Sequence, residues 1–264
     1  MRQPVFSDEW PESWRQSYSA DSAEFWGWRV NVGYTYAYLR RFRETMRQVQ
    51  AYVPRGGRII DVAAGSGNFT LALAEAGYSM VWNDLRTELA DYVALKRETG
   101  TVRYLPGNAF EIEHEQPYDA VIANEVIEHV AHPDDLLRHL RDLCRPGGYL
   151  FLSTPHGAYQ WTDLPTFSEV DDLAALEDRQ FQPGADGHLF LFTNAELRQL
   201  AQAADLEVVE ISNFTSPLLT GSFGRAGKVI RFLPEQLLQR ANSLLERTSP
   251  RLLMNSAAVL QRPR

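Results

Sequence analysis

The sequence predicts an α/β fold in which a doubly wound, mostly parallel sheet carries helices on both faces. Two observations support this. From residue 58 to residue 155, short apolar runs alternate with longer helix-like stretches, which is the pattern of parallel strands joined by crossover helices. Runs such as "VIA" and "YLFL" are continuously apolar, as expected of strands that are buried on both faces.

The N-terminal part reads as helical. Apolar residues recur there at steps of three and four, which gives one apolar stripe; they are Tyr38, Phe42, Met46, Val49 and Val53. Pro54 and the glycines that follow end this helix before the first strand. We therefore expect residues 1–54 to form a helical cap and residues 55–264 to form the main domain.

The elements of the main domain follow in order. The expected strands are 58–62, 78–84, 102–105, 118–124 and 148–154, and the expected helices are 69–77, 87–98 and 133–144. Beyond residue 155 we expect an acidic, solvated helix within 163–179, a helix at 193–206 and a strand at 207–212. The segment 252–262 is the candidate for a last strand, after a late helical insertion at 213–251.

Composition limits the class of protein. The net charge of −8 disfavours a nucleic-acid backbone as the main partner. The one cysteine, Cys144, cannot form an internal disulfide. The first residues lack the apolar core of a signal peptide, and no stretch approaches the roughly 20 apolar residues of a membrane span. We therefore expect a reduced, cytoplasmic protein that binds no nucleic acid.

The stretch "DVAAGSGNF" follows the first strand at residues 61–69. Gly65 and Gly67 allow a tight turn and a close approach of a ligand to the backbone. In an open parallel sheet, ligands bind at the carboxyl ends of the strands. Asp84 ends the second strand, where a carboxylate can accept hydrogen bonds from a ribose. The loop alone also fits a tight turn without a ligand, because it lacks the complete phosphate-binding and dinucleotide motifs.

Taken together, the motifs resemble those of class I S-adenosylmethionine-dependent methyltransferases. The matching segments are the glycine loop, Asp84, "GNAF", "YDAVIANEVIEHV" and "RPGGYLFLSTP". The resemblance is close over residues 58–155 and looser beyond, and "EVIEHV" is similar to the small-molecule branch that includes the quinone O-methyltransferases. It implies a Rossmann-like sheet of seven strands with an antiparallel last strand, and S-adenosylmethionine as the cofactor.

The resemblance also assigns cofactor-binding residues. They are Asp61, Ala63, Gly65, Ser66, Gly67, Asp84, Leu85, Asn108, Ala109, Asn124 and Glu125. The glycine loop would surround the methionine part, Asp84 would bind the ribose, and Leu85 would pack on the adenine. Two residues depart from the family pattern. Ala63 stands where the first glycine is usual, and Asn108 stands where an aspartate is usual, although its amide oxygen can still accept a hydrogen bond.

His129 and His156 are the candidate catalytic residues, because a hydroxyl acceptor benefits from a general base and histidine is the commonest one. The alternatives are a His129 that only bonds to backbone and a His156 in a loop that only packs. The spacing of Glu125, Glu128 and His129 would place them on one helix face. Such a trio could hold Mg²⁺, as the resemblance to quinone O-methyltransferases suggests. Magnesium prefers oxygen ligands, however, so histidine is a poor third ligand and we expect no metal. His188 either reaches the pocket or caps a turn.

Two regions bear on the acceptor. The N-terminal segment is dense in aromatic residues, among which Trp26 and Tyr36 are candidates for the wall of a pocket for an apolar or aromatic substrate. The insertion at 213–251 is basic and amphipathic, which suits a membrane surface or a lipid-like substrate. Packing on its own domain or in a dimer contact is the alternative. The sequence leaves the oligomeric state open.

The resulting hypothesis is methyl transfer from S-adenosylmethionine to a small molecule, at a hydroxyl oxygen. The alternatives are an N- or C-methyltransferase and a non-catalytic protein that binds the cofactor and acts as a partner.

Overall fold

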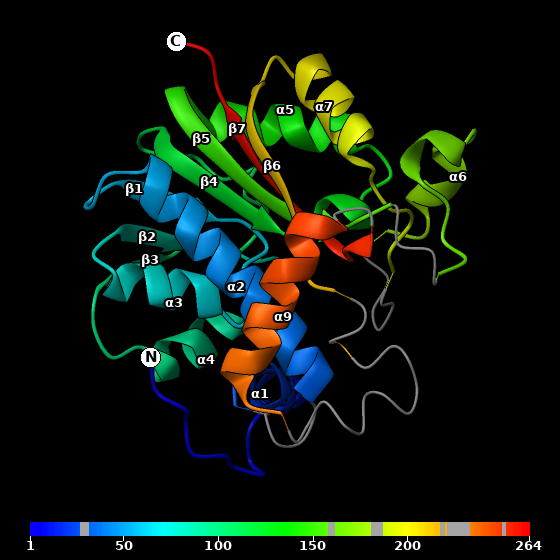
Figure 1. Ribbon diagram of the computed structural model, residues 1–264. Helices are drawn as coiled ribbons and strands as arrows, with labels where there is room; N and C mark the ends of the chain where they lie inside the picture. Colours follow the sequence, from blue (N-terminus) through cyan, green and yellow to red (C-terminus); the bar gives the residue numbers. More distant parts are fainter. Residues whose placement is uncertain (27–31, 158–161, 181–186, 217–219, 221–232, 250–251) are drawn as a thin grey trace.

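A seven-stranded sheet forms the centre of the computed structural model (Figure 1). The structure describes residues 1–26, 32–157, 162–180, 187–216, 220, 233–249 and 252–264. The strands are β1 (Arg58–Asp61), β2 (Ser79–Trp82), β3 (Thr101–Tyr104), β4 (Tyr118–Asn124), β5 (Cys144–Pro155), β6 (Glu207–Phe214) and β7 (Asn255–Gln261). Their order is β3-β2-β1-β4-β5-β7-β6. β7 runs antiparallel to both of its neighbours, which confirms the predicted fold class.

Helices connect and cover these strands. They are α1 (Glu12–Glu24), α2 (Val32–Tyr52), α3 (Asn68–Glu75), α4 (Leu89–Lys96), α5 (Pro133–Leu143), α6 (Ala174–Glu177), α7 (Asn194–Ala203) and α9 (Glu235–Thr248), with single 3₁₀ turns η1 (Ile127–His129) and η2 (Phe167–Glu169). α7 begins with a capping box in which Thr193 and Glu196 satisfy each other's backbone N–H groups.

The acidic stretch 163–179 differs from the prediction of a solvated helix. It forms only η2 and the four-residue α6. The carboxylates that suggested a helix face are engaged locally instead. Glu169 accepts a hydrogen bond from the backbone N–H of Thr166, and Asp172 accepts one from that of Ala175. Such bonds favour turns over a continuous helix.

Alternate residues of each strand face opposite helix layers. Ile59 packs in a core with residues of α2, α3 and α4, whereas Ile60 packs in a second core with residues of α5 and α7. Figure 1 shows α2 lying across one face of the sheet, with α5 and α7 on the other side. This two-sided burial is why the strands read as continuous apolar runs.

The N-terminal helices belong closely to the sheet. α2 contacts β5 and β7, and α1 contacts α2 and α4. The helices before residue 54 thus pack directly on the main domain. The division into a cap and a main domain at residue 54 stays a prediction. In the predicted insertion, α9 lies beside α2 (Figure 1), and Arg40 of α2 pairs with Glu246 at 2.6 Å. Much of the remaining insertion lies outside the described residues.

The strand order places the candidate site. Asp61 at the end of β1 is in register with Trp82 of β2 on one side and with Ile122 of β4 on the other. The chain leaves β1 for β2 and β3, then returns across it to β4. The topology therefore reverses between β1 and β4, and ligands bind at such a point in open α/β sheets. Within the described ranges, no helix is both long and apolar enough to cross a bilayer.

Candidate functional site

A cleft of about 320 Å³ lies at the carboxyl ends of β1 and β4. The glycine loop forms its floor, and residues of α1 and α2 form its other walls. Six of the sequence-predicted cofactor residues line it: Asp61, Ala63, Gly65, Ser66, Asn124 and Glu125. The other five, Gly67, Asp84, Leu85, Asn108 and Ala109, do not line it. The glycine loop and the end of β4, both singled out from the sequence, therefore line the same cleft.

The glycine loop has the backbone shape that its sequence suggested. Gly65 and Gly67 have φ of 54° and 73°, in the region that only glycine enters at little cost. A Cβ on Gly67 would also lie 2.6 Å from Cγ1 of Val93. Ala63 adopts φ 54° without being glycine. The turn is thus intact despite the departure at Ala63, at a cost of about 1–2 kcal/mol in backbone strain.

Asp84 joins the end of β2 to this loop. Its carboxylate is 4% exposed and accepts hydrogen bonds from the backbone N–H groups of Gly65 (2.7 Å) and Arg86 (2.9 Å). The Arg86 guanidinium also lies 3.1 Å from the same carboxylate. A ribose that bound to Asp84 would compete with this guanidinium. Because the Arg86 side chain is 57% exposed, it can turn toward solvent.

The residues predicted to bind the adenine do not line the cleft together. Leu85 is 57% exposed, whereas Ala109 is 3% exposed. The Asn108 amide is used within its own loop, since its oxygen accepts from the N–H of Phe110 (3.1 Å) and its nitrogen donates to Glu111 (2.9 Å). An adenine amino group would have to use the second lone pair of that oxygen. Their cofactor roles stay predictions.

Charged and polar residues that no sequence motif had singled out also line the cleft. Glu24 of α1 and Arg41 of α2 line it, as does Tyr38. Burial raises the pKa of Glu24 to about 7, against the opposing attraction of Arg41. Burial likewise raises the pKa of Asp61 to about 7, against its hydrogen bonds from Thr70. A cationic group of a ligand beside these carboxyls would favour their ionised form and so offset the effect of burial on their pKa.

The end of β4 is strained and polar. Glu125 has φ 53°, and its carboxylate accepts from Ser153 (2.9 Å) and pairs with Arg41 (2.9 Å). The side-chain nitrogen of Asn124 donates to Thr45 at 3.3 Å, but its buried Oδ1 has no hydrogen-bond partner among the residues that the structure describes. Strain and an unsatisfied buried acceptor are typical of a binding site.

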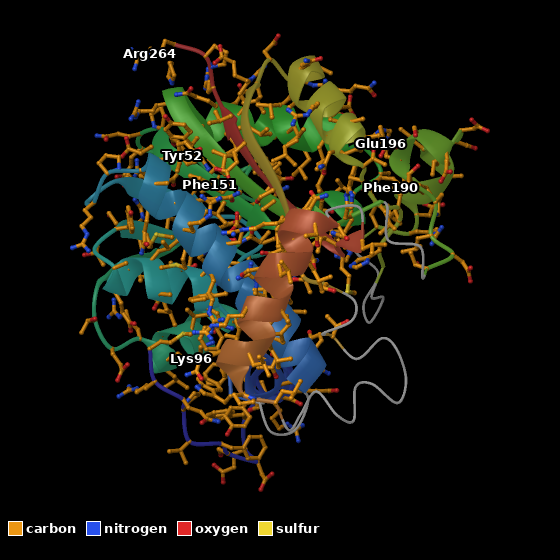
Figure 2. All side chains as sticks on the ribbon, viewed as in Figure 1. Tyr52, Lys96, Phe151, Phe190, Glu196 and Arg264 are labelled. Carbon is orange, nitrogen blue, oxygen red and sulfur yellow. The ribbon has the colours of Figure 1, made fainter. Side chains whose placement is uncertain are left out.

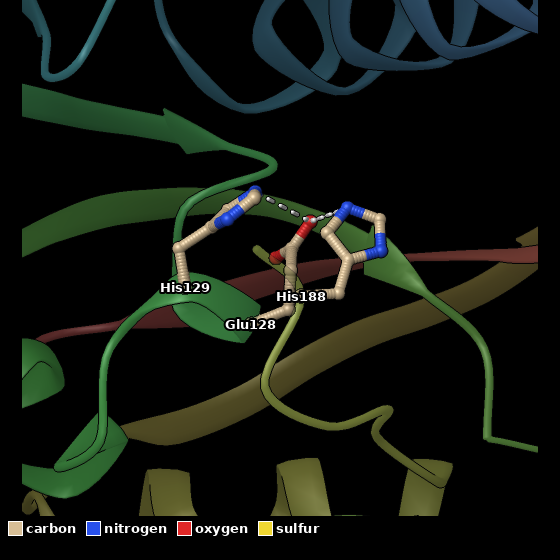
Figure 3. A group of neighbouring side chains, drawn as sticks. All are labelled: Glu128, His129 and His188. Atoms are coloured by element: carbon tan, nitrogen blue, oxygen red, sulfur yellow. Dashed lines mark ion pairs between the residues drawn. The ribbon is translucent and has the colours of Figure 1, made fainter. Parts of the chain in front are cut away.

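Beside this cleft, a buried carboxylate faces two imidazoles (Figure 3). Glu128 is completely buried, and its Oε1 lies 3.9 Å from Nε2 of both His129 and His188. The two rings meet edge to face at 4.8 Å, and each side chain is 34% exposed. The Leu189 N–H donates to the Glu128 carbonyl at 2.8 Å and so fixes the His188 segment against η1.

The expected helix face of Glu125, Glu128 and His129 does not form. Between β4 and α5 the chain forms only the single turn η1, and Glu125 pairs with Arg41 instead. His188 takes its place, so the ligand atoms of Glu128, His129 and His188 lie within 4.8 Å of one another. Two imidazoles and one carboxylate are donors that suit a transition metal better than magnesium. The separations exceed those around a bound ion, so the side chains would have to draw together.

His156 does not fit its predicted catalytic role. It is 5% exposed, with Nδ1 at 3.0 Å from Ser256 Oγ and Nε2 at 3.1 Å from the Asn213 amide nitrogen. Burial lowers its pKa. Both ring nitrogens therefore hold β5, β6 and β7 together. Position at the end of a strand suggested a catalytic role, but the side chain points into the sheet's own packing.

The two aromatic residues expected at the acceptor wall do not line the described cleft. Tyr36 is 1% exposed and packs against Leu238 of α9. The Trp26 ring is tilted against that of Phe25, with centroids 6.1 Å apart. Neither lines the cleft, whereas Tyr38 does.

Comparison with known proteins shows which family the chain belongs to. Residues 34–211 match the family model described as a methyltransferase domain. The ubiquinone biosynthesis O-methyltransferase of Shewanella pealeana is 33% identical over 172 residues, which cover 64% of this chain and 71% of that protein. The protein of the same name from Burkholderia multivorans is 31% identical over 166 residues, covering 61% and 68%.

A solved structure shows the same fold from end to end. The 1,6-didemethyltoxoflavin-N1-methyltransferase of Burkholderia thailandensis, solved with S-adenosylhomocysteine, superposes with a TM-score of 0.53 at 17% identity and covers 99% of this chain and 94% of that one. The strand order, the cleft at the switch point and the match over residues 34–211 agree. The chain therefore belongs to the methyltransferase domain family.

Proposed function

We propose that this methyltransferase transfers a methyl group from S-adenosylmethionine to a hydroxyl oxygen of a small-molecule acceptor. The observation that carries the proposal is that the cleft and a candidate base lie next to each other at the end of β4. Glu125 lines the cleft at the end of β4, and the Glu128–His129 turn follows directly. A methyl donor in the cleft and a base beside it are the two parts that the reaction needs.

The residues of the cleft suit the charges of this cofactor. The acidic groups Glu24, Asp61 and Glu125 match a sulfonium and an ammonium group, and Arg41 matches a carboxylate. The Asp84 carboxylate matches the ribose hydroxyls. When bound, the cofactor supplies an activated methyl group, and the chain holds it in position and excludes water.

His129 is the base in this proposal. Its side chain is 34% exposed, so it can meet an acceptor that enters from solvent. Burial, with a further contribution from Glu125, raises the pKa of Glu128 well above its usual value. A proton gained by His129 places a positive charge near this carboxylate and favours its ionised form. Glu128 thus stabilises the protonated imidazole that forms when the acceptor loses its proton.

The acceptor is proposed from the relatives. The relatives from Shewanella pealeana and Burkholderia multivorans are named for O-methylation in ubiquinone biosynthesis. We propose an apolar or aromatic acceptor with a phenolic hydroxyl group. An acidic hydroxyl of this kind needs only a weak base such as histidine.

The test is methyl transfer in purified protein. Labelled S-adenosylmethionine is offered with phenols and catechols and, separately, with amines, and binding of S-adenosylhomocysteine is measured by calorimetry. We expect transfer to the phenols, and a loss of about 10²–10⁴-fold in kcat for His129→Asn. His132→Asn is the control, because His132 pairs with Glu177 at the surface. Transfer to amines alone, or full activity of His129→Asn, would contradict the proposal.

A second proposal concerns α9. Leu237 and Leu244 are 50% and 63% exposed, and Arg240 and Arg247 alternate with them along one helix face. Apolar and basic side chains on one face suit the surface of an anionic membrane. We propose that α9 brings the protein to a membrane that holds an apolar acceptor. The cytoplasmic location stays a prediction.

A further inference from the structure

A buried polar network ties α1 to the glycine loop. At its centre the Asp21 carboxylate, with no solvent exposure, accepts four hydrogen bonds. Ser66 Oγ and Asn68 Nδ2 each donate to Oδ1 at 2.7 Å. The Tyr92 hydroxyl (2.7 Å) and the Lys96 ammonium (2.5 Å) donate to Oδ2. A residue of the cap is thus fully satisfied by groups of the main domain.

Lys96 completes the network from the other side. It is the last residue of α4 and has no solvent exposure, and Figure 2 shows it beside α1. Besides Asp21, its ammonium donates to the carbonyl of Ser66 (2.9 Å) and to Oδ1 of Asn68 (2.5 Å). All three N–H donors of the ammonium group are therefore used.

The network touches the cleft without lining it. Ser66 lines the cleft, and so do residues on the adjoining face of α1, such as Ser17, Ala20 and Glu24. Asp21 and Lys96 do not. A buried ion pair is seldom a net source of stability, because desolvation offsets the attraction of the charges. Its placement at the junction of loop and cap therefore calls for another explanation.

We propose that the Asp21–Lys96 pair is a positioning device that couples the cap helix α1 to the glycine loop and thereby sets the affinity for the cofactor. The inference rests on the proposed function. Asp21 holds the Ser66 and Asn68 side chains only when α1 is docked. Docking of α1 and the binding-competent shape of the loop therefore occur together. Since linkage is reciprocal, a bound cofactor tightens α1 by the same factor by which docked α1 tightens the cofactor.

The main variant replaces both charges by apolar groups, as Asp21→Leu with Lys96→Met, because changing one alone would leave an unpaired buried charge. The matched control is Glu246→Gln, which breaks the Arg40–Glu246 pair between α2 and α9. Calorimetry with S-adenosylhomocysteine, initial rates and amide hydrogen exchange of α1 are measured on the full chain.

We expect the double variant to bind S-adenosylhomocysteine about tenfold more weakly and to show a KM for S-adenosylmethionine raised by a similar factor. Its kcat at saturating cofactor should stay within about twofold of the original protein. In the original protein the cofactor should slow exchange of α1 amides, and in the double variant it should not. Glu246→Gln should leave cofactor affinity unchanged.

Three results would overturn the inference: unchanged affinity in the folded double variant, equal weakening in Glu246→Gln, or a lower kcat with an unchanged KM. Should the double variant fail to fold, Tyr92→Phe removes one donor to Asp21 and keeps the ring. A two- to threefold weaker affinity is then expected, and an unchanged one overturns the inference. Absence of binding in the original protein would instead overturn the proposed function itself, and the inference with it.

Discussion

Two buried carboxylates at the two ends of the site differ in how they are satisfied. Asp21, at the glycine loop, accepts four hydrogen bonds. Glu128, beyond β4, accepts one side-chain hydrogen bond, from Thr154 to Oε2 at 3.0 Å. Its other oxygen, Oε1, has no hydrogen-bond donor in the part of the chain that is described. Both side chains have no solvent exposure.

The difference separates two kinds of buried carboxyl group. A fully satisfied carboxylate such as Asp21 holds elements in place, and its loss leaves several donors unpaired. An unsatisfied one such as Glu128 is costly to the folded protein, and such a cost is typical of functional sites. The glycine-loop end is therefore built for positioning, and the β4 end for chemistry.

Apart from the loss of activity in His129→Asn, the largest effect is expected at the glycine-loop end. Asp84→Asn should weaken S-adenosylhomocysteine binding about 100-fold, because charge-assisted hydrogen bonds contribute about 1.5–3 kcal/mol. The neutral amide can still accept from Gly65, so the loop should keep its shape. Calorimetry measures the change, with the exposed Asp91→Asn on α4 as control. Equal affinities for the two variants would show that Asp84 serves the loop alone.

The second effect tests the β4 end. Glu128→Gln should lower kcat about 30-fold, with cofactor affinity unchanged, because an amide cannot ionise when His129 gains a proton and so cannot stabilise the protonated imidazole. The thermal midpoint should not fall, since burial raises the pKa of Glu128 and makes its ionised form costly. Asp21→Asn should do the reverse and lower the midpoint. A lower midpoint in Glu128→Gln would remove the distinction between the two carboxylates.

The third effect concerns stability against pH. The pKa of Asp61 is raised from 3.8 to about 7 in the folded protein. Ionisation therefore favours the unfolded chain, and stability falls as pH rises from about 4 to about 7 and is then constant. The shift sets an upper limit of about 4 kcal/mol, and relaxation around the charge leaves about 2 kcal/mol. Asp61→Asn should unfold at a higher temperature than the original protein at pH 8, and this advantage should be small near pH 4.

A variant at Asp119 gives the opposite sign. Burial acts to raise the pKa of Asp119, but the hydrogen bonds from Arg145 and Arg58, together with the charges of both side chains, outweigh burial and lower the pKa. Asp119→Asn should therefore be less stable than the original protein at pH 8. If both variants shifted in the same direction, the burial of Asp61 would not be what governs its behaviour.

The smallest effect is expected outside both ends of the site. Leu244→Ser with Arg247→Gln on α9 should reduce binding to vesicles of an anionic phospholipid about threefold, measured by flotation, because one exposed leucine and one charge contribute little each. Methyl transfer to a water-soluble phenol should not change. The control is Arg138→Gln, which removes a surface charge from α5. Equal flotation of both variants would exclude α9 as the membrane contact.

The sequence by itself determined the sheet, the glycine loop and the residues at the strand ends. These depend on local signals: apolar runs for β4 and β5, glycines where φ is positive, and a carboxylate after β2. The spacing of apolar residues and the residue types of turns depend only on residues close together in the chain, so they can be recognised without a structure. Local signals can also mislead. The acidic stretch 163–179 predicted a helix, but its carboxylates accept hydrogen bonds from nearby backbone groups in turns instead.

Only the tertiary structure decided which side chains share a site. Lys96 meets Asp21 across 75 positions of the chain, and His188 joins Glu128 from a segment after α6. Nothing in the sequence distinguishes Arg41 from its neighbours Arg40 and Arg43. His156, at a strand end like His129, instead faces β6 and β7. Contacts between distant segments depend on how helices pack and on strand register, and local patterns do not encode these.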